Sequence, residues 1–246
     1  FKPAVPVFDA NMALGRRHDR RVLFDSVEDA LREMDRAGVE RALVYSPVSS
    51  SDPVGGNRRL LELLADEPRL VPQLVGSPVR DAIEPFAAGL EAGRGSSMRM
   101  LPALHGYPFR DWAVGPWLEW ASSARVPIWL PVNYGAPRRH EVRKYVEEFD
   151  PSALYDTMTA FPDVTIVLTE VQYAQAPWAL PLLRALPNLH IELSRFVSTD
   201  GVAKLLGLVG ESRILFGSRF PDSPLAAQLY HLHRYGLPDS TLAAIC

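Results

Sequence analysis

Short apolar runs alternate with amphipathic segments along the whole chain. Eight of the runs have the continuous apolar character of strands that are covered on both faces. They are residues 5–11, 41–47, 70–77, 97–103, 126–133, 164–170, 189–195 and 213–217. Strands that alternate with helices are typical of repeated βα units around a parallel sheet. The pattern therefore predicts an α/β protein.

The segments between these runs carry apolar residues at helical spacing. The first of them begins at Ser26, has Asp29 at the capping-box position and ends at Gly38, which is a complete set of helix start and stop signals. Helical spacing also marks residues 56–68, 83–93, 115–125, 152–163, 178–188 and 200–212. Each of the first seven predicted strands is thus followed by a predicted helix.

Eight strands with intervening helices favour a closed (β/α)₈ TIM barrel, and an open doubly wound sheet is the structural alternative. The 246 residues suit one such barrel, so we expect a single domain over residues 1–246. The chain starts at Phe1 and stops inside the helical pattern 240–246. We therefore expect the C-terminus to be incomplete.

Two connections, residues 49–56 and 134–150, are longer than a βα turn requires. Both follow strand ends, and the loops after strand ends form the face of a barrel on which sites are built. They are candidate walls or lids of a pocket. The alternative is that they are surface insertions without a role.

Composition and charge limit the partners. The formal charge is −3, and acidic and basic residues are interspersed, which argues against a nucleic-acid partner. Cys246 is the only cysteine, so no intramolecular disulfide can form, and we expect a cytoplasmic protein. No apolar run approaches the roughly 20 residues that a membrane span needs, so we expect no membrane partner. Assembly with further copies of the chain stays open.

Four segments carry a resemblance to a known family. They are VPVFDANMALG, GNRRLLELLADEPRLVPQLVGSP, NLHIELSRF and RILFGSRFPDSP, in this order. Together they resemble the amidohydrolase superfamily, in particular its amidohydrolase-related group. The resemblance spans nearly the whole chain and implies a metal-dependent hydrolase built as a (β/α)₈ barrel.

The chain departs from that resemblance at the positions that would hold the metal. The two histidines that the family carries after Asp9 are replaced, and the ligands implied for three later strand ends are missing too. The residues that stand at these positions are Asn11, Ala13, Pro131, Glu170 and Arg219.

The chemistry of these replacements predicts that no metal and no other cofactor is bound. Zinc and related ions need several lone-pair donors that converge at about 2.0 to 2.3 Å. The guanidinium of Arg219 offers only donors and a permanent positive charge, and Ala13 offers nothing. Glu170 and Asp9 are too few for a tight site.

Two hypotheses describe what replaces the metal. Arg219 and Glu170 could form a buried ion pair, because a lone buried charge costs far more than a paired one. Alternatively, Arg219 binds a substrate carboxylate or phosphate and Glu170 is a general base. We assign Glu170 and Asp9 as candidate catalytic residues. The candidate substrate-binding residues are Arg219, Asn11, Arg99, Tyr134, Tyr173 and Asp222.

Other polar residues near strand ends are His105, Tyr107, Asn133 and Arg195. A single histidine or tyrosine at such a position is more often a packing residue than a catalyst. No Gly-x-Ser-x-Gly elbow and no phosphate-binding Gly-x-x-x-x-Gly-Lys motif occurs, so covalent catalysis is unsupported.

Two functions remain. The first is a metal-independent hydrolase of an ester, lactone or amide in a small, carboxylate-bearing and hence anionic molecule. The second is a catalytically inactive barrel that acts as a binding or scaffold protein. A pocket in which Arg219 can meet an anion favours the enzyme, whereas a mouth filled by Trp129 and Phe220 favours the scaffold.

Overall fold

Short parallel strands form the centre of the molecule. The computed structural model describes residues 2–17, 21–93, 95–133 and 149–246. The strands are β1 (Phe8–Ala13), β2 (Arg41–Tyr45), β3 (Leu70–Pro72), β4 (Leu74–Gly76), β5 (Met98–Met100), β6 (Ile128–Pro131), β7 (Ile166–Thr169), β8 (Leu189–Glu192) and β9 (Ile214–Leu215). All their pairings are parallel, in the orders β1-β2-β3 and β4 through β9.

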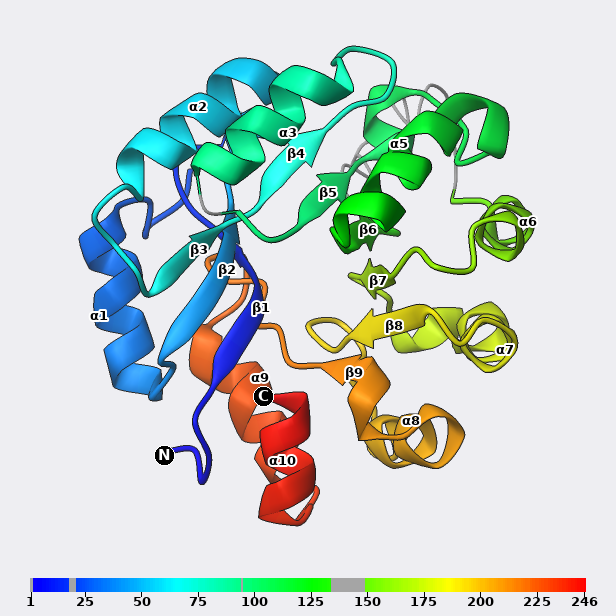
Figure 1. Ribbon diagram of the computed structural model, residues 1–246. Coiled ribbons are helices and arrows are strands. Elements are labelled where there is room, and N and C mark those ends of the chain that lie inside the picture. Colours follow the sequence, from blue (N-terminus) through cyan, green and yellow to red (C-terminus); the bar gives the residue numbers. More distant parts are fainter. Residues whose placement is uncertain (1, 18–20, 94, 134–148) are drawn as a thin grey trace.

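The strands β1 to β3 form one sheet and β4 to β9 form another, and backbone hydrogen bonds at both junctions join the two sheets into a ring (Figure 1). β3 and β4 are one predicted strand that is interrupted at Gln73, and the Gln73 N–H still bonds the Val44 carbonyl of β2 at 2.7 Å. On the other side, the N–H of Ala10 in β1 donates to the carbonyl of Phe216 after β9 at 2.9 Å. The fold is therefore the predicted (β/α)₈ barrel.

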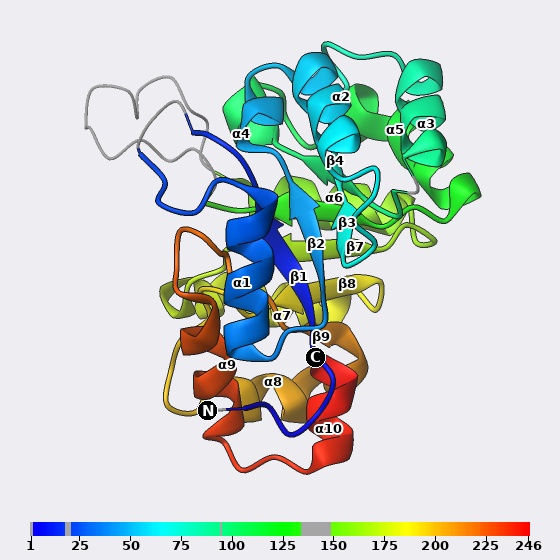
Figure 2. The ribbon, with the colours of Figure 1, turned by 90° about the vertical axis from the view of Figure 1, so that its left-hand side faces the viewer.

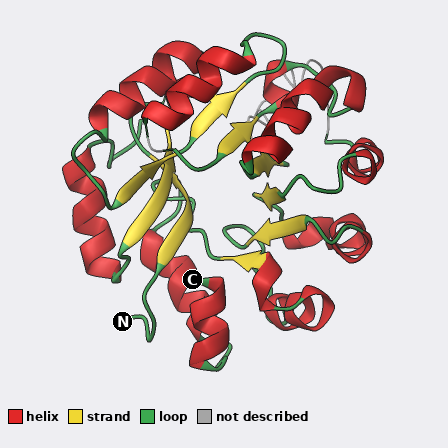
Figure 3. Ribbon diagram, in the orientation of Figure 1, coloured by secondary structure: helices red, strands yellow, loops and turns green. Residues whose placement is uncertain are grey.

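Helices surround this ring, as Figure 3 shows in red. They are α1 (Val27–Ala37), α2 (Pro53–Leu63), α3 (Ile83–Ala92), α4 (Pro102–His105), α5 (Asp111–Ala124), α6 (Pro151–Ala160), α7 (Ala176–Ala185), α8 (Gly201–Val209), α9 (Leu225–His233) and α10 (Asp239–Ile245). Short 3₁₀ turns are η1 (Pro47–Ser50), η3 (Tyr173–Gln175) and η4 (Glu211–Arg213).

The caps predicted for α1 are confirmed. The Ser26 hydroxyl accepts a hydrogen bond from the Asp29 N–H at 3.1 Å, which satisfies one of the free donors of the first turn. The helix ends at Gly38, whose φ of 75° lies in the left-handed region that glycine adopts without strain.

Two of the differences from the predicted boundaries occur where a proline begins a helix. The strand predicted over 97–103 ends at Met100, because Pro102 is well suited to the first turn of a helix and begins α4. The loop predicted over 49–56 is wrong, since η1 covers Pro47–Ser50 and α2 begins at Pro53, capped by Asp52. The predicted loop over 134–150 lies almost entirely outside the described residues.

The barrel has two different ends. Figure 2 shows β1 and β2 pointing toward the end that is remote from both termini, and we call that end the strand-end face. At the opposite end the C-terminal helix α10 meets the strands, where the carbonyl of Cys246 accepts from Phe8 and that of Ile245 accepts from Phe216. Loops that follow the strands therefore gather on the strand-end face, where barrel sites form.

The inside of the barrel is apolar in one layer and polar above it. Ala10, Leu43, Trp129 and Val167 form a buried cluster contributed by four different strands. Side chains alternate along a strand, so the next inward position of each strand lies one layer closer to the strand-end face. Those positions include Tyr45, Thr169 and, on β8, Glu192, all of them buried.

Gly56 marks a close packing of α2 on η1. A Cβ at this position would lie 2.4 Å from the backbone nitrogen of Ser49. We expect Gly56→Ala to lower the free energy of unfolding by about 1 to 3 kcal/mol in chemical denaturation, because the backbone cannot yield without moving η1. Gly207→Ala is the matched control, since its Cβ meets nothing within 4 Å in α8 and should stabilise by about 0.5 to 1 kcal/mol. Equal stability of the two variants would contradict this packing.

Candidate functional site

A cluster of charged side chains lies on the strand-end face, contributed by residues that follow β1, β7, β8 and β9. A carboxylate oxygen of Glu170 lies 3.4 Å from Nε of Arg219 and 3.7 Å from a guanidinium nitrogen of Arg195. Asp222 in turn lies 3.2 Å from Arg219 and 3.1 Å from Arg17. We call these five residues the outer charged cluster. It contains the ion pair between Glu170 and Arg219 that the sequence suggested.

The backbone of this cluster is held in an unusual conformation. Glu170 has a φ of 60° and Arg219 a φ of 59°, which is the left-handed region that side-chain-bearing residues rarely adopt. Hydrogen bonds hold both residues, because the Asn133 side chain donates to the Glu170 carbonyl at 2.7 Å and the Arg219 N–H donates to the Asn11 carbonyl at 2.8 Å. Such strain persists where the surroundings determine it, and it is common at functional sites.

The outer charged cluster carries more positive than negative charge. Among these described residues, the three guanidinium groups of Arg17, Arg195 and Arg219 face the two carboxylates of Glu170 and Asp222. Burial lowers the pKa of Arg195, and the nearby charge of Arg219 lowers it further, against the opposing effect of Glu170 and Asp222. An added anion would relieve this repulsion.

A second group of polar residues lies inside the barrel. Arg99 of β5 is fully buried, and its guanidinium donates to the side-chain oxygens of Gln73 at 2.7 Å and Asn11 at 2.8 Å. It also lies 4.0 Å from the centre of the Tyr45 ring, which is within the range of a cation–π contact. The partners of this buried cation are therefore two neutral amides and an aromatic ring.

Asn11 connects Arg99 to a buried acid. Its amide nitrogen donates to the Glu192 carboxyl at 3.0 Å, while its amide oxygen accepts from Arg99. Ser194 adds two hydrogen bonds to Glu192, from its N–H and, at 2.8 Å, from its hydroxyl. We call Gln73, Arg99, Asn11, Glu192 and Ser194 the inner polar chain.

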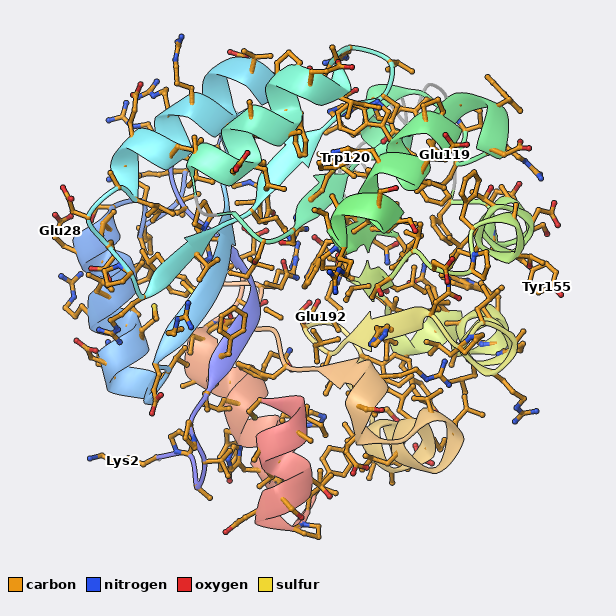
Figure 4. The ribbon with its side chains drawn as sticks, in the orientation of Figure 1. Lys2, Glu28, Glu119, Trp120, Tyr155 and Glu192 are labelled. Carbon is orange, nitrogen blue, oxygen red and sulfur yellow. The ribbon has the colours of Figure 1, made fainter. Side chains whose placement is uncertain are left out.

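Glu192 is the main residue that the sequence analysis missed. Figure 4 shows it in the middle of the ring of strands. It is fully buried, and burial raises its pKa to about 7, helped by the charge of Asp9 and opposed by the hydrogen bonds from Ser194 and Asn11. Gly217 lies against it so closely that a Cβ there would be 2.1 Å from the carboxyl oxygen. The available signal was an acid in the apolar run of β8.

Asp9 links the two groups. Its Oδ1 accepts from the N–H groups of Asn11 at 3.0 Å and Ser218 at 2.9 Å, and burial raises its pKa. Ser218 immediately precedes Arg219. Asp9 therefore fixes the turn that presents Arg219, while its Oδ2 has no hydrogen-bond partner among the described residues.

The buried polar atoms that lack a hydrogen bond also lie in the strands or after the strand ends. Buried polar groups are nearly always paired, so each exception calls for an explanation. Within the described part of the chain, all eight such atoms belong to strands or to residues that follow a strand end. They come from Asp9, Ser49, Ser77, Arg99, His105, Tyr107, Thr169 and Arg219.

The remaining predicted residues lie elsewhere. The Tyr173 hydroxyl accepts a hydrogen bond from Lys204 of α8 at 2.9 Å and lies 3.5 Å from Asp200, and its ring packs on that of Phe196. Tyr134 lies outside the described residues. Trp129 belongs to the apolar layer of the barrel, where its indole N–H donates to the Ala10 carbonyl at 2.9 Å, and Phe220 packs on Phe24.

Two cavities lie outside the barrel, between α2 and α3. Their volumes are about 460 and 450 Å³, and both are lined by Leu61. Neither is lined by a residue of the outer charged cluster or of the inner polar chain. No helix in the described ranges is both long enough and apolar enough to cross a membrane.

The residues at the expected ligand positions do not fit a divalent metal ion. Glu170 is shared by two guanidinium groups, and Asn11 is engaged on both sides by Arg99 and Glu192. The described residues contain no group of three or more His, Cys, Asp or Glu side chains arranged to hold a metal. Arg219 adds positive charge where a cation would have to bind.

Comparison with known proteins identifies the family. The model of a family described as "Amidohydrolase" matches residues 7–246. Comparison with curated protein sequences gave no match.

Several solved structures share the fold. One is 5-carboxyvanillate decarboxylase from Sphingomonas paucimobilis, with a TM-score of 0.74, 13% identity and coverage of 98% of this chain and 96% of that chain. The enzyme of the same name from Novosphingobium aromaticivorans, solved with bound manganese, has a TM-score of 0.75 at 10% identity over 98% and 94% of the chains. A 2,6-dihydroxybenzoate decarboxylase from Rhizobium has a TM-score of 0.71 at 13% identity over 98% and 96%.

The raised pKa of Glu192 predicts how stability depends on pH. Between about pH 5 and 7 the folded protein keeps a proton on Glu192 that the unfolded chain has lost, so the free energy of unfolding falls as pH rises through this window. We expect Glu192→Gln to reduce this fall, on the order of 1 kcal/mol per pH unit, in chemical denaturation at several pH values.

The exposed Glu84→Gln is the matched control and should follow the wild-type pH profile. Asp9 contributes with the same sign and is present in all three proteins, so the difference between the profiles isolates Glu192. Identical profiles for Glu192→Gln and wild type would show that Glu192 titrates normally.

Proposed function

Because the chain belongs to the amidohydrolase family, we propose that it binds a small carboxylate-bearing molecule at the strand-end face and hydrolyses an ester, lactone or amide bond in it without a metal ion. The proposal has three parts: the carboxylate site, the acid–base groups and the absence of a metal. Each part has its own support and its own test.

The excess of positive charge in the outer charged cluster is the main support for the proposal. Arg195 and Arg219 approach the same carboxylate of Glu170, and burial, together with the charge of Arg219, lowers the pKa of Arg195. Guanidinium groups bind carboxylates through paired, charge-assisted hydrogen bonds. A substrate carboxylate that meets Arg195 and Arg219 would balance their charge, and Asp222 would keep Arg219 in place at 3.2 Å.

Glu170 and Asp9 supply the acid–base chemistry in this proposal. Glu170 takes a proton from a water molecule, the resulting hydroxide attacks the carbonyl carbon, and the leaving oxygen or nitrogen receives a proton as its bond to that carbon breaks. Asp9 is the second acid–base group, because burial raises its pKa and its Oδ2 has no partner among the described residues. Asn11 and Arg99 shape the inner side of the site.

Metal independence is supported by the donor set. A metal-dependent relative holds its ion with several convergent lone pairs, whereas here Arg219 lies 3.4 Å from the carboxylate of Glu170. The positive charge that a metal would supply comes from guanidinium groups, which polarise a carbonyl less strongly than a metal ion does.

Decarboxylation is a second candidate reaction. The solved structures with this fold include enzymes named for the decarboxylation of 5-carboxyvanillate and 2,6-dihydroxybenzoate. Their substrates carry a carboxylate, and so does the molecule proposed here. Carboxylate binding is therefore common to both reactions, and only the product distinguishes them.

The carboxylate site predicts the effect of removing an arginine. We expect Arg219→Ala and Arg195→Ala each to weaken binding of benzoate about 10- to 100-fold in calorimetric titration, because each loses a charge-assisted contact. Arg58→Ala on the exposed face of α2 is the matched control and should bind as the wild type does. Unchanged affinity in both cluster variants would contradict the carboxylate site.

The reaction is tested by product analysis on carboxylate-bearing esters, lactones, amides and aromatic acids. We expect release of an acid from an ester, lactone or amide, and a loss of at least about 100-fold in kcat for Glu170→Gln with little change in KM. Carbon dioxide from an aromatic acid would favour decarboxylation. Binding without any turnover would favour the scaffold.

Metal analysis tests the third part. We expect purified protein to contain much less than one equivalent of zinc, manganese or iron. Treatment with dipicolinate should leave both the thermal midpoint and the turnover unchanged, because the described residues offer no set of convergent donors that could lose an ion. A stoichiometric metal whose removal abolishes turnover would overturn the proposed metal independence.

A further inference from the structure

We propose that His105, Tyr107, Ser49 and Ser77 form a second subsite on the strand-end face, which binds a neutral hydroxyl group of the ligand through Nδ1 of His105. We call these residues the histidine subsite. The inference rests on the proposed function in one respect, because the hydroxyl group would belong to the molecule whose carboxylate meets Arg219. The subsite itself can be probed with a neutral compound that has no carboxylate.

The four residues come from neighbouring parts of the barrel. Ser49 lies in η1 after β2, Ser77 follows β4, and His105 ends the short helix α4 after β5. Nε2 of His105 lies 2.9 Å from the Ser50 carbonyl, and the rings of His105 and Tyr107 are 6.3 Å apart between centroids. All four therefore lie on the strand-end face, on the β2, β4 and β5 side.

The contact with Ser50 determines the tautomer of His105. A carbonyl oxygen can only accept a hydrogen bond, so Nε2 must carry the hydrogen and Nδ1 of the neutral ring carries a lone pair. Burial lowers the pKa of His105, and the charge of Arg80 lowers it further, while the Ser50 carbonyl and Asp81 oppose this shift. Near neutral pH the ring is thus uncharged, with Nδ1 as a hydrogen-bond acceptor.

Four buried polar atoms of this subsite have no hydrogen bond among the described residues. They are Ser49 Oγ, Ser77 Oγ, His105 Nδ1 and Tyr107 Oη. The backbone of Leu101 is close enough to lower the pKa of Tyr107, but no hydrogen bond of acceptable geometry joins them. A core built only for stability avoids such atoms, because each costs free energy unless solvent or a ligand pairs with it.

The chemistry of the subsite selects a neutral group. The acid nearest to it, Asp81, already accepts the Ser77 N–H at 2.8 Å. The side chains that remain are one acceptor, His105 Nδ1, and hydroxyl groups that can both donate and accept. An alcohol or phenol matches this set, since its O–H donates to Nδ1 and its oxygen accepts from Tyr107 or a serine.

The position of the subsite gives the class of molecule. Glu170, Arg195 and Arg219 of the outer charged cluster follow β7, β8 and β9, whereas the histidine subsite follows β2, β4 and β5. The two therefore lie on different sides of the same barrel mouth. A molecule that engages both has a carboxylate at one end and a hydroxyl group at the other.

Nitrogen NMR of the labelled histidines tests the subsite directly. We expect His105 to be the Nε2–H tautomer at pH 7.5, with its Nδ1 resonance shifted by phenol and not by anisole, which cannot donate. His105→Gln is expected to keep an N–H near the Ser50 carbonyl and to lose the Nδ1 acceptor. The same shift with phenol and anisole, or an Nδ1–H tautomer, would overturn the proposal.

A pair of acids separates this inference from the proposed function. We expect 3-(4-hydroxyphenyl)propanoate to bind about 2- to 10-fold more tightly than 3-phenylpropanoate, an advantage lost in His105→Gln and kept in the matched control His190→Gln. Arg219→Ala should weaken both acids and leave the NMR response to phenol intact. Equal affinity of the two acids in the wild type would overturn the inference while leaving the carboxylate site standing.

Tyr107→Phe keeps the test valid if His105→Gln does not fold. This variant removes a hydroxyl that has no partner among the described residues, so its thermal midpoint should not fall. It should nevertheless lose part of the affinity advantage of the hydroxylated acid. A lower thermal midpoint together with an unchanged advantage would show that Tyr107 serves packing alone and would overturn its place in the subsite.

Discussion

Desolvation of charged groups is the constraint on which the arrangement at the barrel mouth depends. A guanidinium or carboxylate that leaves water must find partners inside the protein. The partners of Arg99 are the side-chain amides of Gln73 and Asn11 and the Tyr45 ring. The amide nitrogen of Asn11 in turn donates a hydrogen bond to Glu192. Arg219 finds its partner in Glu170. Some buried polar atoms of the described residues remain without a partner, and they are the basis of the binding sites proposed above.

The inner polar chain and the outer charged cluster act together through Asp9. Its carboxylate accepts from Ser218 and so holds the turn in which Arg219 adopts a left-handed backbone. Apolar side chains fill the layer of the barrel below them. The backbone at Ser218 and the two carboxylates of Glu170 and Asp222 hold the guanidinium of Arg219 in place. A preorganised cation of this kind suits an anionic ligand.

The sequence predicted the barrel fold and some of the residues that meet at the candidate site. Continuous apolar strands and capped helices report local preferences, so α1 and the strand order could be predicted. The pair of Glu170 and Arg219 followed from charge complementarity between two unusual residues. Glu192 was missed, because nothing local shows that one acid in an apolar strand points into the barrel. The histidine subsite was missed for a related reason, since the tautomer of His105 depends on the contact of Nε2 with the Ser50 carbonyl far away in the chain.

The sequence by itself determined the fold family and which residues stand at the expected ligand positions, because both follow from residue identity along the chain. Only the tertiary structure decided which polar groups meet. Asn11 lies 88 positions from Arg99 and 181 from Glu192, and closure of the barrel brings the three together. The tertiary structure also decided the pKa of Glu192 and the tautomer of His105, since both depend on burial and on distant partners.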